Sequence, residues 1–111
     1  MIVRNETRGQ VLGYKVSGAS TFRLRLLGLM FRSTLPQGEG LLIRPCRQVH
    51  THFMRFPIDV IFLDDDNRVV RVIPAMAPWK FSPSVSGAVS VLELPAGAAG
   101  ATAPGDLLDI M

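Results

Sequence analysis

Several residue types are scarce in this chain of 111 residues, which has one cysteine, one tryptophan, one tyrosine and two histidines. Because Cys46 is alone, no internal disulfide can form. The apolar runs are short, and even the stretch 58–63 cannot span a bilayer. Charged residues make up 19% of the chain and hydrophobic residues 48%, a balance typical of globular proteins that excludes an intrinsically disordered chain.

The N-terminal residues lack the apolar core of a secretory signal peptide. We therefore expect a cytoplasmic protein with no membrane partner, which also suits a lone thiol. The length favours a single domain over residues 1–111, large enough to bury a core.

The net charge of +3 is unevenly distributed. Residues 21–55 contain six arginines and one glutamate, a net charge of +5, whereas the rest of the chain contains six basic and eight acidic residues, a net charge of −2. Arginine presents a planar set of donors that suits carboxylate and phosphate groups. The basic stretch carries no nucleic-acid motif, so a small anion is favoured over nucleic acid.

Many short strand-like runs predict a mainly β fold, a small antiparallel β-barrel or sandwich with one short helix near residues 20–30. The helix is expected over 21–30, capped by Ser20. The clearest element is a hairpin of 58–63 with 68–73, joined by an acidic turn. Residues 74–87 are expected to form a loop that lies over the core, with Trp79 covering the core. Residues 95–105 are expected to form a loop or a short helix. The other runs that read as strands are 10–16, 41–44, 49–53, 88–94 and 106–110.

The segment 44–55 holds the densest set of chemically versatile side chains. If residues 50–55 are extended, His50, His52 and Met54 share one face, and Thr51, Phe53 and Arg55 share the other. A straight strand would put Cys46 about 13 Å from His50, and no further Cys or carboxylate lies nearby in sequence. The segment therefore predicts neither a metal site nor a cofactor site.

Two acidic residues interrupt apolar strands. Asp59 lies among core-facing residues, so its carboxylate needs a partner, either Arg55 or backbone groups. The carboxylate of Glu93 also needs a partner. We expect Glu93 either to pair with an arginine or to point into a pocket.

A series of motifs in a fixed order makes the chain resemble an uncharacterised family, the domain of unknown function number one hundred and ninety-two. The resemblance covers residue 19 to the C-terminus and is closest to the branch with a Cys and a His-Thr pair. It implies a compact β-barrel or sandwich with one short helix, and no established activity. The motifs are 28–32, 40–43, Pro45-Cys46, His50-Thr51, Met54-Arg55, 58–63, 92–97 and Gly105-Asp106. The site positions that the resemblance implies are Arg32, His50, Thr51, Met54, Arg55, Asp59, Glu93 and Asp106.

These observations favour a binding module for a small anionic or polar ligand over an enzyme. The expected ligand-binding residues are Cys46, His50, Thr51, Arg55 and Asp59, with Arg55 as the charge partner of the ligand. One alternative is a hydrolase or thiol enzyme that uses Cys46 as nucleophile and a histidine as base. Another is a protein-interaction domain that docks a partner through the loop containing Trp79 and Phe81.

Overall fold

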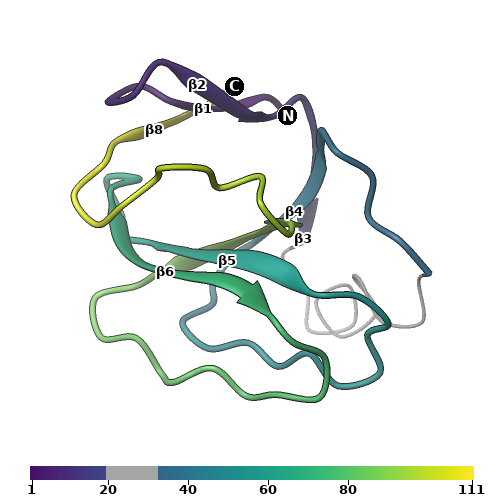
Figure 1. The fold of residues 1–111 in the computed structure, drawn as a ribbon. Coiled ribbons are helices and arrows are strands. Elements are labelled where there is room, and N and C mark those ends of the chain that lie inside the picture. The colour runs from purple at the N-terminus through teal and green to yellow at the C-terminus, as the bar shows by residue number, and fades with distance from the viewer. Residues whose placement is uncertain (20–32) are drawn as a thin grey trace.

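A computed structural model describes residues 1–19 and 33–111, which form two β-sheets packed face to face (Figure 1). The smaller sheet has the order β2–β1–β8, and the larger has the order β3–β4–β7–β5–β6. The strands are β1 (Val3–Asn5), β2 (Gln10–Gly13), β3 (Lys15–Ala19), β4 (Glu39–Ile43), β5 (Ile58–Leu63), β6 (Val69–Met76), β7 (Ser90–Pro95) and β8 (Leu108–Ile110). The sandwich expected from the sequence is confirmed, and neither sheet closes into a barrel.

The central strands β5 and β7 are buried along their whole length because both faces of the larger sheet are covered. One face packs on the smaller sheet through Val3, Leu12, Ile61, Leu92 and Leu108. The opposite face packs against loop residues such as Cys46, Val49 and Met54, which meet Val60 and Val91. Burial on both faces explains why residues 58–63 are almost continuously apolar instead of alternating.

The predicted hairpin is confirmed as β5 and β6, which pair antiparallel. β1 lies outside every run expected from the sequence, and β3 extends past the expected run to Ala19. The other strands match the expected runs, with three further differences. The run 10–16 is divided between β2 and β3, which belong to different sheets, because the amides of Tyr14 and Lys15 both donate to the Gly38 carbonyl at 2.9 Å and turn the chain.

The second difference is that β3 and β4 are parallel, so the sheet is not wholly antiparallel. Parallel neighbours need a crossover of a dozen or more residues, and the stretch 20–38 supplies it. The expected helix at 21–30 and its Ser20 cap lie outside the described residues, as does Arg32.

The third difference is that residues 49–53 do not form a strand. His50 makes only an isolated bridge to Phe81, and the chain then turns, with the Met54 amide donating to the Thr51 carbonyl at 3.2 Å. Residues 50–55 therefore do not divide into the two strand faces expected from the sequence. After β7 ends at Pro95, the residues up to 105 form turns. Of the two forms expected for 95–105, a loop and a short helix, the structure shows the loop.

Both ends of the chain lie beside the smaller sheet (Figure 1), where Ile2 and Met111 exchange two backbone hydrogen bonds. Among residues 1–19 and 33–111, no helix is long and apolar enough to cross a membrane.

Gly40 tests the close approach of β4 to β7. A Cβ atom at Gly40 would lie 2.8 Å from the Glu93 carbonyl oxygen, whereas one at Gly18 would meet only the end of the Met1 side chain at 3.4 Å. We expect Gly40→Ala to lower the free energy of unfolding by about 1–3 kcal/mol, and Gly18→Ala to change it by about 0.5 kcal/mol or less. Urea denaturation measures both, and equal effects would contradict this packing.

Candidate functional site

Thr51 joins two loops, 47–55 and 77–85, that lie side by side over one face of the larger sheet. Its amide donates to the Lys80 carbonyl at 2.9 Å, and its carbonyl accepts from the Trp79 amide at 2.9 Å. Its hydroxyl donates to the Ala77 carbonyl at 2.6 Å and accepts from the Lys80 amide at 2.9 Å. Thr51 is fully buried, so it holds the loops together and offers nothing to a ligand directly.

Five rings gather on these two loops, and we call them the aromatic platform: His50, His52, Phe53, Trp79 and Phe81. The His52 ring lies 4.6 Å from Phe81 and 5.6 Å from Trp79, between ring centroids, and Phe53 lies 4.9 Å from Trp79. Phe53, Trp79 and Phe81 remain 47%, 57% and 70% exposed. The expectation that Trp79 covers the core is therefore wrong.

Phe53 and Trp79 both have left-handed backbone conformations, with φ values of 65° and 64°. A bulky residue rarely adopts this conformation, and each instance costs about 1–3 kcal/mol. Strain of this kind concentrates at functional sites. The platform therefore combines two unfavourable features, a strained backbone and exposed aromatic surface, in the same two residues.

The two histidines differ in their hydrogen bonding. Burial, and to a lesser extent the neighbouring His52, lower the pKa of His50, so its ring is neutral at pH 7. Its Nδ1 accepts the His52 amide at 3.3 Å, which places the proton of the neutral ring on Nε2 as a donor. In the described part of the chain, Nδ1 of His52 is buried with no hydrogen-bond partner.

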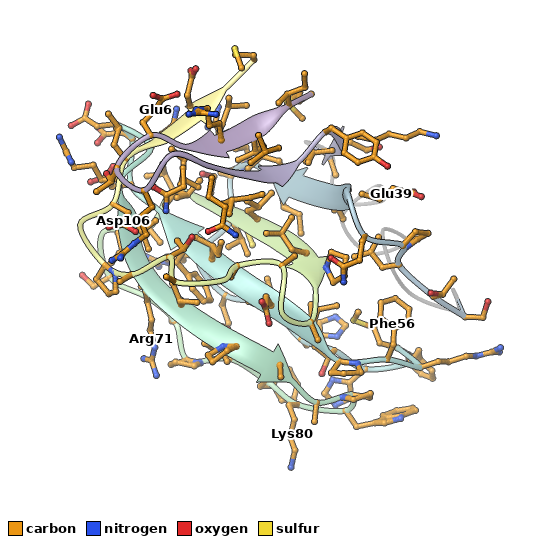
Figure 2. All side chains as sticks on the ribbon, turned by 45° about the horizontal axis from the view of Figure 1, so that its top comes forward. Glu6, Glu39, Phe56, Arg71, Lys80 and Asp106 are labelled. Carbon is orange, nitrogen blue, oxygen red and sulfur yellow. The ribbon has the colours of Figure 1, made fainter. Side chains whose placement is uncertain are left out.

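The surroundings of the platform are basic. The loops 47–55 and 77–85 contain Arg47, Arg55 and Lys80 and no acidic residue. Arg44 lies before them, and its Nη2 donates to Asn67 Oδ1 at 2.7 Å in the turn between β5 and β6. Arg55 and Lys80 are exposed, and Figure 2 shows the Lys80 side chain extending away from the body of the protein.

Asp59, in contrast, is 2% exposed and takes all its hydrogen bonds from backbone amides. Ala75 donates to Oδ1 at 2.8 Å, and Gly97 and Ala99 donate to Oδ2 at 3.0 and 2.9 Å. Pairing with Arg55 is therefore wrong, and the backbone alternative is confirmed. Asp59 pairs with Leu94 in the ladder, on the face that meets the smaller sheet, so it lies away from the loop-covered face.

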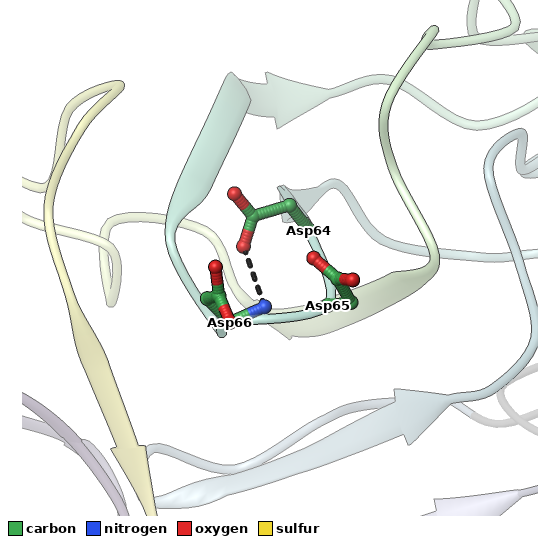
Figure 3. Close-up of side chains that lie close together, drawn as sticks. All are labelled: Asp64, Asp65 and Asp66. Carbon is green, nitrogen blue, oxygen red and sulfur yellow. Dashed lines mark hydrogen bonds between the residues drawn. The ribbon is translucent and has the colours of Figure 1, made fainter.

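Cys46 is 7% exposed, and its Sγ donates to the Gln48 carbonyl at 3.1 Å. It does not join the histidines in a metal-binding set. Within residues 1–19 and 33–111, the carboxylates of Asp64, Asp65 and Asp66 alone place three potential ligand atoms close together (Figure 3). Asp64 Oδ1 there accepts the amides of Asp66 and Arg68 at 2.9 Å each, which is the turn expected for the hairpin.

Glu93 lies on the loop-covered face of the larger sheet, beside Leu41 and Val60 in the ladder. It is 5% exposed, and burial raises the pKa of its carboxyl group to about 7. No arginine pairs with Glu93 among the residues that the structure describes.

Asp106 belongs to a separate network at the other side of the molecule from Lys80 (Figure 2). It accepts hydrogen bonds from Arg8 Nε at 2.6 Å and Asn5 Nδ2 at 3.0 Å, which lower the pKa of its carboxyl group to about 2. Asn5 also donates to the Thr102 hydroxyl at 3.0 Å. This network attaches the 102–106 turn to β1, so Asp106 has a structural role.

Of the five ligand-binding residues expected from the sequence, the structure therefore places only His50 and Arg55 at or near an accessible surface. The sequence indicated the loop of Trp79 and Phe81 only as an alternative docking surface, and it missed Phe53, because the turn that brings these rings together depends on backbone conformations without a glycine signature. The aromatic residues between the prolines of 74–83 were the signal for that alternative.

The fold and these surfaces define a small two-layer β-protein with one basic, aromatic loop region. The chain belongs to the uncharacterised family DUF192 (Uncharacterized ACR), whose model matches residues 3–110. It is 36% identical over 98 residues to a UPF0127 protein of Pyrococcus furiosus, covering 84% of this chain and 82% of that protein. A UPF0127 protein of Thermococcus sibiricus is 35% identical over 97 residues, covering 84% of this chain but 62% of that protein.

Two crystal structures share the fold. A protein of unknown function from Novosphingobium aromaticivorans has a TM-score of 0.82 and 26% identity, covering 98% of this chain and 82% of that chain. A putative transcription regulator from Sinorhizobium meliloti has a TM-score of 0.83 and 23% identity, covering 97% and 89%. Because the Sinorhizobium meliloti protein is only 23% identical to this chain, its likeness shows a shared fold and nothing more.

Replacing Asp59 tests its structural role. Asn keeps the shape but turns an NH2 group toward backbone N–H donors, so we expect Asp59→Asn to lower the free energy of unfolding by about 2–4 kcal/mol. Asp65→Asn, in the exposed turn, should change it by less than about 0.5 kcal/mol. Chemical denaturation checks both, and a mild effect of Asp59→Asn would contradict the three-amide arrangement.

The raised pKa of Glu93 gives the stability a pH dependence. Between its ordinary pKa of 4.5 and about 7, the folded protein binds this proton more fully than the unfolded chain does. The free energy of unfolding therefore falls as pH rises, by roughly 3 kcal/mol for this group. Glu93→Gln removes the contribution, so the stability difference between variant and wild type should grow from pH 4 to pH 8. A constant difference in urea denaturation would contradict the shift.

Proposed function

We propose that this protein is a binding module whose aromatic platform takes a small anionic ligand with an apolar or ring face. The observation that carries the proposal is the pair Phe53 and Trp79, which are strained in the backbone and exposed at the surface although both features are unfavourable. Binding of a ligand that stacks on these rings would explain why the protein maintains this unfavourable arrangement.

The charge of the ligand follows from the loops around the platform. They contain three basic residues, Arg47, Arg55 and Lys80, and no acidic one, so an anion gains favourable electrostatic interactions there. The neutral His50 ring adds an Nε2–H donor. An anion with a flat apolar part satisfies the cations and the rings together.

The position of Cys46 favours this proposal over a thiol enzyme. Its Sγ donates to the Gln48 carbonyl at 3.1 Å, and Cys46 is a member of the buried core cluster with 7% of its surface exposed. A nucleophilic thiol needs a base within hydrogen-bond reach and access for a substrate.

Trp79 is the single tryptophan of the chain, so its fluorescence reports directly on the platform. We expect benzoate, which has both a ring and a carboxylate, to change the emission with a dissociation constant of roughly 1 mM. Acetate, with no ring, and benzyl alcohol, with no charge, should bind at least about tenfold more weakly. Equal responses to all three compounds, or none, would contradict the proposal.

Two arginine variants form the matched control. Arg55→Ala should weaken benzoate binding about fivefold or more because it removes a cation beside the platform. Arg71→Ala removes an exposed arginine from β6 and should leave the affinity unchanged. If both variants weaken binding equally, the effect is one of net charge and the site assignment is wrong.

A second candidate is a protein partner that docks on the same rings, favoured by the exposure of Phe53, Trp79 and Phe81. Apolar contact would carry this interaction, so it should persist at high salt and be lost in Trp79→Ala. An anionic ligand held by Arg55 should instead bind more weakly as salt is raised.

A further inference from the structure

A cleft separate from the aromatic platform lies where β2 turns into β3. It has a volume of about 430 Å³ and is formed by residues 10–14, by Gln37 and Gly38 ahead of β4, and by Gly97 and Ala98 after β7. This volume is within the range of small-ligand sites. Since three distant segments of the chain form the cleft, its shape depends on the complete fold.

Glycines keep the walls of the cleft in place. Gly38 has a φ of 89°, and a Cβ atom there would overlap the Tyr14 ring, so the ring packs directly on the glycine backbone. Gly100 has a φ of 57°, and a Cβ atom there would lie 2.6 Å from Nε2 of Gln10. At Gly97, with a φ of 91°, nothing lies within 4 Å of the Cβ position, which leaves backbone open to an incoming group.

Tyr14 is 65% exposed, and part of its ring packs on the backbone of Gly38. The amides of Tyr14 and Lys15 both donate to the Gly38 carbonyl at 2.9 Å, directly beneath the ring. An exposed tyrosine offers an apolar ring surface and a polar tip to a ligand.

The lining is uncharged and mixes polar groups with the apolar side chains of Val11, Leu12 and Ala98. Of the described residues around the cleft, none carries a charge at pH 7, and the amides of Gln10 and Gln37 each offer two donors and an acceptor with two lone pairs. Such a set suits a ligand with many hydroxyl groups and no net charge. It contrasts with the basic surroundings of the aromatic platform, so the two sites select different ligands.

We infer that this cleft binds a neutral sugar ring, which stacks on Tyr14 and forms hydrogen bonds with Gln10 and Gln37. The alternative of a peptide added to the edge of β2 is less favoured. β2 has four residues, and its register with β1 shifts between Val3 and Arg4, so it offers a short and irregular template. The inference is independent of the function proposed for the platform.

The direct test is a chemical-shift titration of the whole protein, labelled with ¹⁵N, with the β-1,4-linked trimers of glucose and of N-acetylglucosamine. We expect at least one trimer to shift the amides of residues 10–14, 37–38 and 97–98, with a dissociation constant of roughly 1 mM or below. Glucuronic acid, a charged sugar, should bind more weakly. Shifts confined to the platform residues, or absent at about ten times that concentration, would overturn the inference.

Matched variants separate stacking from folding. Tyr14→Ala should weaken sugar binding at least about tenfold, whereas Tyr14→Phe keeps the ring and should stay within about threefold of the wild type. Phe53→Ala should leave sugar binding unchanged while weakening benzoate binding at the platform. Unchanged sugar affinity in a folded Tyr14→Ala protein, or stronger binding of a four-residue extended peptide than of either trimer, would contradict the sugar site.

Discussion

The buried carboxylate of Asp59 is the interaction on which both surface sites depend. From the middle of the sandwich it holds the end of β6 through Ala75 and the turn after β7 through Gly97 and Ala99. The first contact sets where the chain leaves β6 for the loop that carries Trp79 and Phe81. The second sets the backbone of Gly97 and Ala98, which forms one wall of the cleft. A charged group with three amide donors is among the stronger hydrogen-bonding arrangements available in a core.

Other buried polar contacts also hold loops against the two sheets. Thr51 joins the two loops that carry the platform, and Asp106 with Asn5 and Arg8 attaches the last turn to β1. With the loops held in this way, the protein tolerates left-handed conformations at Phe53 and Trp79. Glu93 is a different case, since its buried carboxyl group becomes neutral near pH 7 and has no ion-pair partner among the described residues.

Much of the fold could be predicted from sequence, because alternation and β-branched runs mark strands that bury one or both faces. The hairpin of β5 and β6, the strands β4 and β7, and the closing strand β8 follow from such runs. The parallel pairing of β3 with β4 and the turn at Thr51 could not be predicted, since both depend on contacts between distant residues. The candidate site was predicted less well for the same reason. Residues near in sequence, such as Arg55 and Asp59, have different environments, while His52 and Phe81 are brought together by the loops.

The central claim is that the carboxylate of Asp59 holds in place the two segments that form the surfaces. Amide hydrogen exchange, followed by NMR in the unliganded protein, tests it most directly. The account predicts that the amides of Ala75, Gly97 and Ala99 exchange slowly and at similar rates, because all three donate to one buried carboxylate. Exchange of these three amides as fast as that of the exposed loop residue Ser86 would contradict it.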